Sequence, residues 1–352
     1  MKLLHVTATH LNPVGGIPVV LRDLVEAQNR IIGFEARVLS IRAGILQINS
    51  KYFDVLEKKT FKEYLELYKP DLVIFHSHYY FEYLALYKDL VKNNIPYYIE
   101  PHGSFGYEAL KKSKVKKEIA NRLIFKTFME QAKGYIFLND EEKAKSRFRT
   151  KFDLVIPNGI DPKKIVMNII PKKEWFFYYI GRFDITHKGL DFLFEALSNL
   201  DKKKKNIKLK LYGTGSVNEI NYVNSRIKRF NFVKIVNCGP VYGELQNEVL
   251  EQSGIMILTS RYEGFPMTVL EGWKYGNPCI VTPGTNVSRE AFDNKLGWRV
   301  ELDPVSIGEI MLKASQEYSQ HSKEYIVRCK NYVQDRYSWE RIAELSYQSL
   351  KK

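Results

Sequence analysis

The sequence has little cysteine and no apolar run long enough to cross a membrane. Its three cysteines, Cys238, Cys279 and Cys329, form no CxxC pair and have no nearby histidine. This argues against a disulfide framework and a zinc site, so we expect reduced, mostly buried thiols. A membrane-spanning helix needs about 18 to 20 apolar residues, and no run reaches that length. Residues 1–6 lead directly into a predicted strand rather than a signal peptide, so we expect a cytoplasmic protein.

Sequence motifs for metal ions are also missing. The chain contains no Asp-x-Asp motif and no cluster of histidine and aspartate with the spacing of metal ligands. We therefore expect no metal ion and no other cofactor. There is no short-period repeat, so any internal duplication is of whole domains.

The composition is that of a globular protein in which strand and helix patterns alternate. The 352 residues are 45% hydrophobic and 27% charged, which suits two α/β domains with a cleft. The alternation implies parallel sheets with helices on both faces. We place the first domain at residues 1–165 and the second at 166–334, and expect a C-terminal helix at about 335–352 to pack back on the first. Predicted strands lie at 3–8, 36–40, 72–75, 97–100, 134–138, 154–156, 176–180, 208–212, 233–237 and 255–258.

The net charge of +14 calls for an anionic partner or surface. One predicted helix, at about 110–126, combines many cations with an apolar stripe. Such a helix suits an anionic membrane surface, but a solvated face over an ordinary core stripe has the same pattern, and the sequence leaves both open. No helix-turn-helix, zinc or aromatic-platform signature is present, so we expect no nucleic-acid partner. The cations of the predicted helix at 110–126 are Lys111, Lys112, Lys114, Lys116, Lys117, Arg122 and Lys126. Its apolar residues are Leu110, Val115, Ile119, Leu123 and Phe125.

The segment 254–282 predicts a strand, a loop, a helix and a second strand. Its first apolar run, residues 255–258, is short and suits a strand buried on both faces. Pro266 fits the first helical position, and Gly276 is a helix stop. This places Glu263 in the loop and Glu271 in the helix, at the C-terminal end of a parallel strand, where open α/β sheets bind ligands.

Two cations follow an earlier predicted strand in the same way. Arg182 stands at the start of the loop 181–189 and Lys188 stands at its end, just before a predicted helix. Arginine offers a bidentate fork, lysine a compact charge and the helix start its backbone donors, so the loop suits a diphosphate. Carboxylates beside a diphosphate would oppose binding unless they face hydroxyls, so Glu263 and Glu271 are expected to contact sugar and ribose.

These motifs resemble the retaining GT-B glycosyltransferases of family four, also called group one. The resemblance rests on Gly181-Arg182 with Lys188-Gly189, on the segment from Glu263-Gly264-Phe265 to Glu271, and on Gly276-Asn277-Pro278. It extends along the whole chain through Val14-Gly15-Gly16-Ile17, Pro101-His102-Gly103, Pro157-Asn158-Gly159-Ile160-Asp161, Gly297, Asp303-Pro304 and Tyr337-Ser338-Trp339. It implies a GT-B architecture, in which two Rossmann-like domains with parallel sheets face each other across a cleft.

The resemblance also implies roles for residues of both domains. Arg182 and Lys188 would hold the diphosphate and stabilise the leaving group, and the backbone N–H groups of Gly15 and Gly16 would approach it from the first domain. His102 would lie near the donor sugar and the acceptor, where it could orient the sugar or help the acceptor hydroxyl lose its proton. No carboxylate nucleophile is evident, which agrees with front-face attack as favoured for this family.

The remaining donor-site residues are expected from the same resemblance. Gly264 and Phe265 belong to the sugar site, and Tyr242 is a candidate for contact with the nucleobase. The chain departs from the family at Pro266 and Gly272, where many members have glycine and alanine. Proline removes one backbone donor from the sugar site, so this departure bears on donor identity.

We therefore predict a metal-independent, retaining hexosyltransferase that uses a nucleotide diphosphate sugar, with UDP as the expected nucleotide. The acceptor is expected to be a hydroxyl of a glycan, lipid-linked, in capsular, exopolysaccharide or other cell-surface glycan synthesis. The protein would then work on the inner face of the cell membrane through the basic helix. Two alternatives stay open at this point: a nucleotide-sugar epimerase, and a non-catalytic glycan-binding subunit of the same fold.

Overall fold

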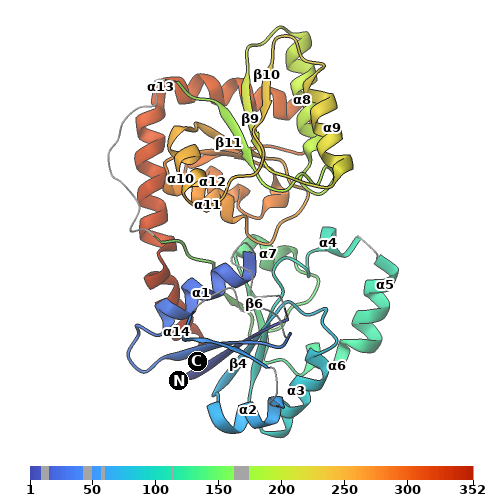
Figure 1. Ribbon diagram of the computed structural model, residues 1–352, viewed down its shortest axis with the longest axis vertical. Helices are drawn as coiled ribbons and strands as arrows, with labels where there is room; N and C mark the ends of the chain where they lie inside the picture. The colour runs from blue at the N-terminus through green and yellow to red at the C-terminus, as the bar shows by residue number, and fades with distance from the viewer. Residues whose placement is uncertain (9–15, 43–49, 57–59, 112–113, 162–173, 352) are drawn as a thin grey trace. The chain divides into compact units, whose positions relative to one another are not determined.

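A computed structural model describes residues 1–8, 16–42, 50–56, 60–111, 114–161 and 174–351. The chain divides into two compact units (Figure 1). Unit 1 consists of residues 1–159 and 337–352, and unit 2 of residues 160–336. The predicted boundary between residues 165 and 166 falls outside the described residues, as does Gly15.

Unit 1 is built on a seven-stranded sheet in the order β3-β2-β1-β4-β5-β6-β7. Every paired strand in it is parallel. The chain winds from β1 to one edge, then returns to β4 and winds to the other edge, so the connections reverse direction between β1 and β4. The strands are β1 (Lys2–Thr7), β2 (Glu35–Ser40), β3 (Phe53–Val55), β4 (Leu72–His76), β5 (Tyr97–Glu100), β6 (Gly134–Phe137) and β7 (Leu154–Val155).

The C-terminal helix of the chain belongs to unit 1, although it is separated from the rest of the unit by all of unit 2. Helix α14 (Trp339–Leu350) lies beside α1 (Gly16–Gln28), where Gln28 Nε2 donates to Ser346 Oγ at 3.0 Å (Figure 1). The other helices of unit 1 are α2 (Phe61–Tyr68), α3 (Tyr83–Lys92), α4 (Tyr107–Lys111), α5 (Lys114–Ile119), the π-helical turn η1 (Ala120–Ile124), α6 (Lys126–Glu130) and α7 (Asp140–Lys145).

Unit 2 repeats the same winding with six parallel strands in the order β10-β9-β8-β11-β12-β13. The direction reverses between β8 and β11, the arrangement of a doubly wound dinucleotide-binding fold. Its strands are β8 (Phe177–Ile180), β9 (Lys208–Tyr212), β10 (Lys234–Asn237), β11 (Ile255–Leu258), β12 (Cys279–Val281) and β13 (Gly297–Arg299). Its helices are α8 (Leu190–Lys202), α9 (Val217–Ile227), α10 (Gly243–Gln252), α11 (Met267–Lys274), the 3₁₀ turn η3 (Pro283–Thr285), α12 (Ser288–Asp293) and α13 (Pro304–Tyr337), which kinks at His321.

The segment 254–282 folds as strand, loop, helix and strand. All four residues of β11 are buried, as their apolar character predicts. Helix α11 begins at Met267, so Pro266 is its N-cap residue and not its first helical residue, one position away from the prediction. The helix stops as predicted, because Gly276 takes a left-handed φ of 78° and Asn277 N–H donates to Gly272 O at 2.9 Å.

The predicted single helix at 110–126 is confirmed only in part. Helix α5 continues directly into the π-helical turn η1, and α6 follows after Phe125, whereas residues 112–113 between α4 and α5 lie outside the described residues. In the π-helical turn the Phe125 N–H bonds to Ala120 O, five residues back, at 2.9 Å. The wider turn places Asn121 where its Nδ2 donates to Tyr79 OH at 3.0 Å, and it buries the Phe125 ring. None of the helices that the structure describes is long and apolar enough to cross a membrane.

Gly189 lies so close to the loop that contains Thr259 that a substitution there tests how tightly the two loops pack. It caps α8 with a left-handed φ of 64°, and a Cβ added there would lie 2.0 Å from Thr259 O on the neighbouring loop. We expect Gly189→Ala to destabilise the unit by about 3 kcal/mol or more, because backbone strain and a clash with backbone add. Gly239→Ala is the matched control: φ is 75° but no atom lies within 4 Å, so only about 1 to 2 kcal/mol is expected. Thermal unfolding of both variants measures the difference, and equal losses would contradict the clash.

Candidate functional site

The loops after β8 and β11 meet where the winding of unit 2 reverses. Lys188 comes from the first loop and Glu263 from the second, and Lys188 Nζ lies 2.5 Å from Glu263 Oε1. Both side chains are mostly buried, with 17% and 12% of their surface exposed. Ser260 Oγ donates to the same carboxylate oxygen at 2.5 Å. The sequence therefore placed these two residues correctly at the strand ends, and the structure adds that they form an ion pair.

Contacts between backbone and side chains fix the two loops against each other. Thr259 Oγ1 donates to the carbonyls of Lys188 and Gly189 at 3.1 and 3.0 Å. Two nitrogens of the Arg261 guanidinium reach the two oxygens of Asp191 at 2.9 and 2.7 Å, a bidentate pair that spans the loops. The carboxylate of Glu263 is thus held in place, and its Oε2 has no hydrogen bond among the described residues. That oxygen is the acceptor that a substrate hydroxyl can use.

Arg182 does not join this cluster. Its side chain is 64% exposed, and its Nη2 lies 3.3 Å from Asp184 Oδ2 within its own loop. Its backbone is anchored by Tyr179 OH, which donates to Arg182 O at 2.6 Å. An exposed guanidinium is able to turn toward an anion, whereas Lys188 is already positioned. The two predicted diphosphate contacts therefore differ in how far they are prearranged.

Glu271 lies in α11 and is held by α10. Gln246 Nε2 donates to Glu271 Oε2 at 2.8 Å. Burial raises the pKa of the Glu271 carboxyl to about 7, against the smaller opposing effects of Gln246 and Lys274. A carboxyl with this pKa is a hydrogen-bonding group whose charge is easily altered by a ligand.

Glu271→Gln should change how the stability of the protein depends on pH. The folded pKa of Glu271 exceeds its usual value of 4.5, so folding favours the protonated form, and wild type loses stability as pH rises toward and past 7. Glutamine cannot ionise. We expect the free energy of unfolding of the variant, relative to wild type, to rise by on the order of 2 kcal/mol between pH 5 and pH 8. Chemical denaturation at both pH values measures it. The exposed Glu309→Gln on α13 is the control, and an equally flat profile for both would contradict the raised pKa.

The other predicted donor-site residues are dispersed around these loops. Gly264 follows Glu263, and the Phe265 ring is largely buried. Tyr242 is 58% exposed and directly precedes α10. In unit 1, Gly16 is the first residue of α1, and Gly15 lies outside the described residues.

His102 lies in a cluster of unit 1 that the sequence analysis missed. It follows β5, and its Nε2 lies 3.0 Å from Nδ1 of His76, the last residue of β4. Glu100, the last residue of β5, has its carboxylate oxygens 3.5 Å from His76 and 3.4 Å from His102. Histidine and glutamate side chains can bind metals, and one ligand atom of each of these three residues lies within 4.8 Å of the others. Only the topology brings them together, because 24 residues separate His76 from Glu100, and no ligand motif has that spacing.

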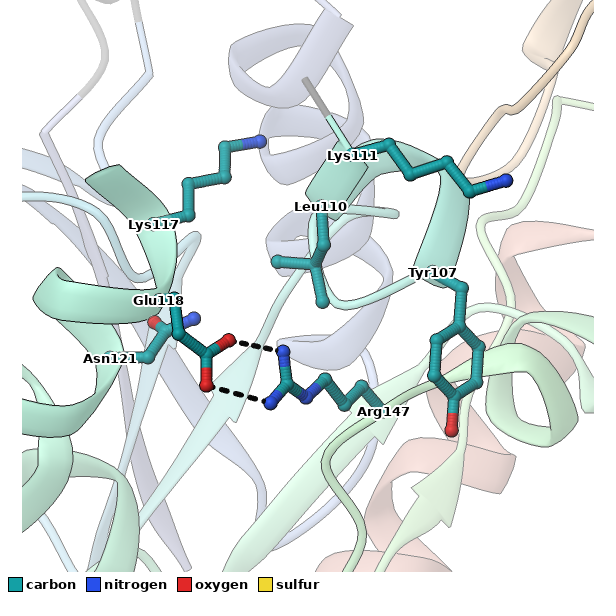
Figure 2. Close-up of a pocket in the computed structure, with 7 residues that line it drawn as sticks. All are labelled: Tyr107, Leu110, Lys111, Lys117, Glu118, Asn121 and Arg147. Atoms are coloured by element: carbon teal, nitrogen blue, oxygen red, sulfur yellow. Dashed lines mark hydrogen bonds and ion pairs between the residues drawn. The ribbon is translucent and has the colours of Figure 1, made fainter. Parts of the chain in front are cut away.

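The basic segment of unit 1 surrounds a cavity of about 400 Å³. Figure 2 shows it between α4 on one side, with Tyr107 and Leu110, and α5 and the start of η1 on the other, where the Arg147 guanidinium pairs with the Glu118 carboxylate. Lys111 and Lys117 line it as well. The cavity thus combines an apolar wall with positive charge, a combination that can receive part of an anionic amphiphile.

The apolar residues of this segment divide into two groups. Leu110 and Phe125 are buried at 6% and 2% exposure. Val115, Ile119 and Leu123 instead expose 71%, 51% and 78% of their surface. An ordinary core stripe would bury them. The interpretation of this segment as a solvated face over a core stripe is therefore wrong for these three residues. The surface that they form, called the apolar ridge below, is flanked by lysines and arginine.

Comparison with known proteins assigns the class. Residues 14–164 match the model of Glycosyltransferase Family 4, and residues 161–311 match that of Glycosyl transferases group 1. An uncharacterised glycosyltransferase of Methanocaldococcus jannaschii is 25% identical over 58% of this chain and 55% of its own length. Lipopolysaccharide 1,6-galactosyltransferase of Escherichia coli is 31% identical over 36% of this chain and 35% of its own. The matched regions thus span about half or less of these curated relatives.

Solved structures show the same fold over the whole chain. Sucrose-phosphate synthase from Thermosynechococcus elongatus superposes with a TM-score of 0.76 at 17% identity, covering 100% of this chain and 98% of that one. HepE from Anabaena, solved in complex with UDP, gives a TM-score of 0.73 at 16% identity with full coverage of both chains. The fold is therefore GT-B, with two parallel-sheet α/β domains. The two family models together span residues 14–311, and the chain belongs to the group 1, family 4 glycosyltransferases.

Proposed function

We propose that the protein transfers a sugar from a UDP-sugar to a hydroxyl of a glycan acceptor, with retention of configuration. The observation that carries this proposal is the Lys188–Glu263 pair at the point where the winding of unit 2 reverses. Nucleotides bind at this point of doubly wound sheets, outside the carboxyl ends of the strands. Membership of a glycosyltransferase family supports the sugar chemistry.

The contacts divide the donor into regions. Lys188 and the exposed side chain of Arg182 would bind the diphosphate. The oxygen of Glu263 that has no hydrogen bond among the described residues would accept from a sugar hydroxyl, and Glu271 would contact the ribose. Tyr242 would face the nucleobase, and Gly15 and Gly16 would bring backbone donors from unit 1. UDP is favoured as the nucleotide because HepE, which shares the fold, was solved in complex with UDP.

Transfer would proceed without a metal ion at the diphosphate. Two cations, Arg182 and Lys188, would balance the charge that develops on the leaving group. The sequence contains no Asp-x-Asp motif to hold a metal there. His102 would act on the sugar or acceptor from unit 1, and the departing phosphate would accept the proton of the acceptor hydroxyl.

The acceptor would be a lipid-linked glycan at the inner face of the cell membrane, used to build a capsule, exopolysaccharide or other cell-surface glycan. Two features of unit 1 support this: the apolar ridge and the cavity lined by Lys111, Lys117 and Arg147. An exposed apolar surface beside cations suits a bilayer with anionic headgroups. The relation to a lipopolysaccharide galactosyltransferase points to the same class of acceptor.

Replacing a residue of the apolar ridge should weaken membrane binding. Leu123 is 78% exposed, and inserting its side chain into a bilayer stabilises binding by roughly 1.5 to 3 kcal/mol. We expect Leu123→Ser to lower affinity for vesicles containing anionic lipid by about tenfold or more. The control is Val217→Ser, which removes an exposed apolar residue at the start of α9 in unit 2. Co-sedimentation with vesicles measures both, and equal binding of the two variants would argue against the membrane surface.

A panel of nucleotide sugars tests the function itself. The purified protein is incubated with each donor and with lipid-linked acceptor, and release of nucleoside diphosphate is recorded. Release that depends on one UDP-sugar and on the acceptor is the expected result. Conversion of the sugar without any acceptor would instead identify an epimerase, and binding without turnover of any donor would identify a non-catalytic subunit.

A further inference from the structure

A line of buried polar side chains crosses the centre of the unit 1 sheet and ends at His102. Gln28 of α1 contacts His5 of β1, with 3.1 Å between Gln28 Oε1 and His5 Nε2. His5 Nδ1 lies 2.9 Å from His76 Nε2, and His76 Nδ1 lies 3.0 Å from His102 Nε2. These are hydrogen-bond distances, so the four side chains form an unbroken chain.

The direction of the chain follows from its first member. Gln28 Nε2 donates to Ser346 Oγ of α14, so its Oε1 faces His5 and accepts from His5 Nε2–H. A neutral imidazole carries one N–H, so His5 Nδ1 must accept from His76 Nε2–H. By the same rule His76 Nδ1 accepts from His102 Nε2–H. Each histidine is then protonated on Nε2, and Nδ1 of His102 is left as an acceptor.

Burial keeps the histidines neutral, as this alternation requires. It lowers the pKa of both His5 and His102 from 6.5 to about 4, and that of His76 well below 6.5. The titratable groups that face His102 are His76 and Glu100. Burial also raises the pKa of the Glu100 carboxyl, which favours its neutral form.

The backbone holds His102 in an unusual conformation. Its φ of 48° lies in the left-handed region, which costs a residue other than glycine about 1 to 2 kcal/mol. The turn is fixed by Glu142 of α7, whose carboxylate accepts from the N–H groups of Gly103 and Leu138 at 2.6 and 2.7 Å. Both the backbone and the ring of His102 are thus constrained, a pattern found where a side chain must be aimed.

The geometry of the histidine pairs favours hydrogen bonds over a metal ion in this cluster. The His5–His76 and His76–His102 pairs have nearly the same geometry, with ring centroids 5.1 and 5.2 Å apart and rings inclined by 30° and 31°. Both rings of the second pair lie beside the Glu100 carboxylate, whereas in the first pair only His76 does, so the shared geometry does not depend on the carboxylate.

We propose that Gln28, His5 and His76 are positioning residues that hold His102 as its Nε2–H tautomer, so that Nδ1 accepts a hydrogen bond from a substrate hydroxyl. The side chain of His102 is 13% exposed, and Nδ1 has no hydrogen bond among the described residues. The hydroxyl, of donor sugar or acceptor glycan, rests on the function proposed above. The tautomer does not, because it follows from the internal contacts alone.

Nitrogen NMR of the full-length protein labelled with ¹⁵N-histidine tests the tautomer directly, because protonated and unprotonated ring nitrogens resonate at well-separated frequencies. We expect His5, His76 and His102 to appear as Nε2–H tautomers from pH 7 down to about pH 5. His102→Gln identifies the signals of His102 by their loss. His76→Phe should leave His102 as a mixture of tautomers. The control is His321→Asn, which replaces an exposed histidine of α13 and should leave the signals of His102 unchanged.

The wild-type spectrum decides the proposal even if His76→Phe fails to fold. Protonation of His102 on Nδ1, or a mixture of tautomers in wild type, would overturn it. So would an Nε2–H signal of His102 that appears only after EDTA treatment, since the cluster would then hold a metal. The expected spectrum from a protein that turns over no donor would contradict the proposed function and leave the histidine chain standing.

Discussion

Glu263→Gln is expected to lower kcat/KM for sugar transfer by about 10²- to 10³-fold, the size of effect seen when one preorganised polar contact to a transition state is removed. Glutamine keeps the shape of the side chain but removes its charge. The carboxylate is held by Lys188 Nζ and Ser260 Oγ, both at 2.5 Å, and we propose its second oxygen as the acceptor for a sugar hydroxyl. A neutral amide oxygen accepts that bond more weakly.

The same substitution should not weaken binding of UDP. In wild type Glu263 neutralises Lys188, and its negative charge repels a diphosphate. Removing that charge frees the lysine for the phosphates, so affinity for UDP should stay the same or rise while turnover falls. Donor turnover and calorimetric titration of UDP separate these effects, with Glu195→Gln on the exposed side of α8 as control. Turnover of Glu263→Gln at the wild-type rate would refute the assignment.

Lys188→Met is expected to give the opposite pattern, with UDP affinity reduced by about 10- to 100-fold. Methionine preserves most of the aliphatic stem and removes the ammonium. A hydrogen bond to a charged group contributes about 1.5 to 3 kcal/mol, which corresponds to this range. The mostly buried carboxylate of Glu263 also loses its cation and then faces the diphosphate directly. Two effects therefore act in the same direction.

Calorimetric titration at several salt concentrations checks the Lys188 prediction. Lys202→Met, at the exposed end of α8, is the matched control, and it should bind UDP as wild type does. Arg182→Met should cost less than Lys188→Met, because Arg182 is exposed and must lose side-chain freedom to bind. Equal affinity of wild type and Lys188→Met would place the diphosphate elsewhere.

Much of the fold could be predicted because the strands of a parallel sheet are apolar and are separated by helical patterns. The short run 255–258 is the clear case: four apolar residues form the buried strand β11. Strands β3 and β13 were missed. Each has three residues, and their sequences, Phe53–Val55 and Gly297–Arg299, include polar side chains and lack a continuous apolar run.

The candidate site of unit 2 was accessible to sequence reasoning because strand ends of a parallel sheet share one edge. That rule places Lys188 near Glu263, although 75 residues separate them. It does not say that the two pair with each other, or that Arg182 turns outward to Asp184, because side-chain direction depends on packing. The roles of these residues in sugar transfer stay predictions.

The histidine chain of unit 1 could not be predicted in the same way. His5 lies within β1, His76 ends β4 and His102 follows β5. Gln28 comes from α1. Each residue alone has the pattern of a core or turn position. Their alignment depends on strand register, which pairs His5 with Ile74 and His76 with Glu100. Strands β1 and β4 are buried on both faces, so they lack the alternation of apolar and polar residues that would mark their register in the sequence.

A crystal structure of the protein grown with UDP tests the central claim most directly. We predict that the diphosphate lies within hydrogen-bond distance of Lys188 Nζ at the ends of β8 and β11, and that the ribose contacts Glu271. UDP bound at another edge of the sheet, with the Lys188–Glu263 pair untouched, would contradict the account.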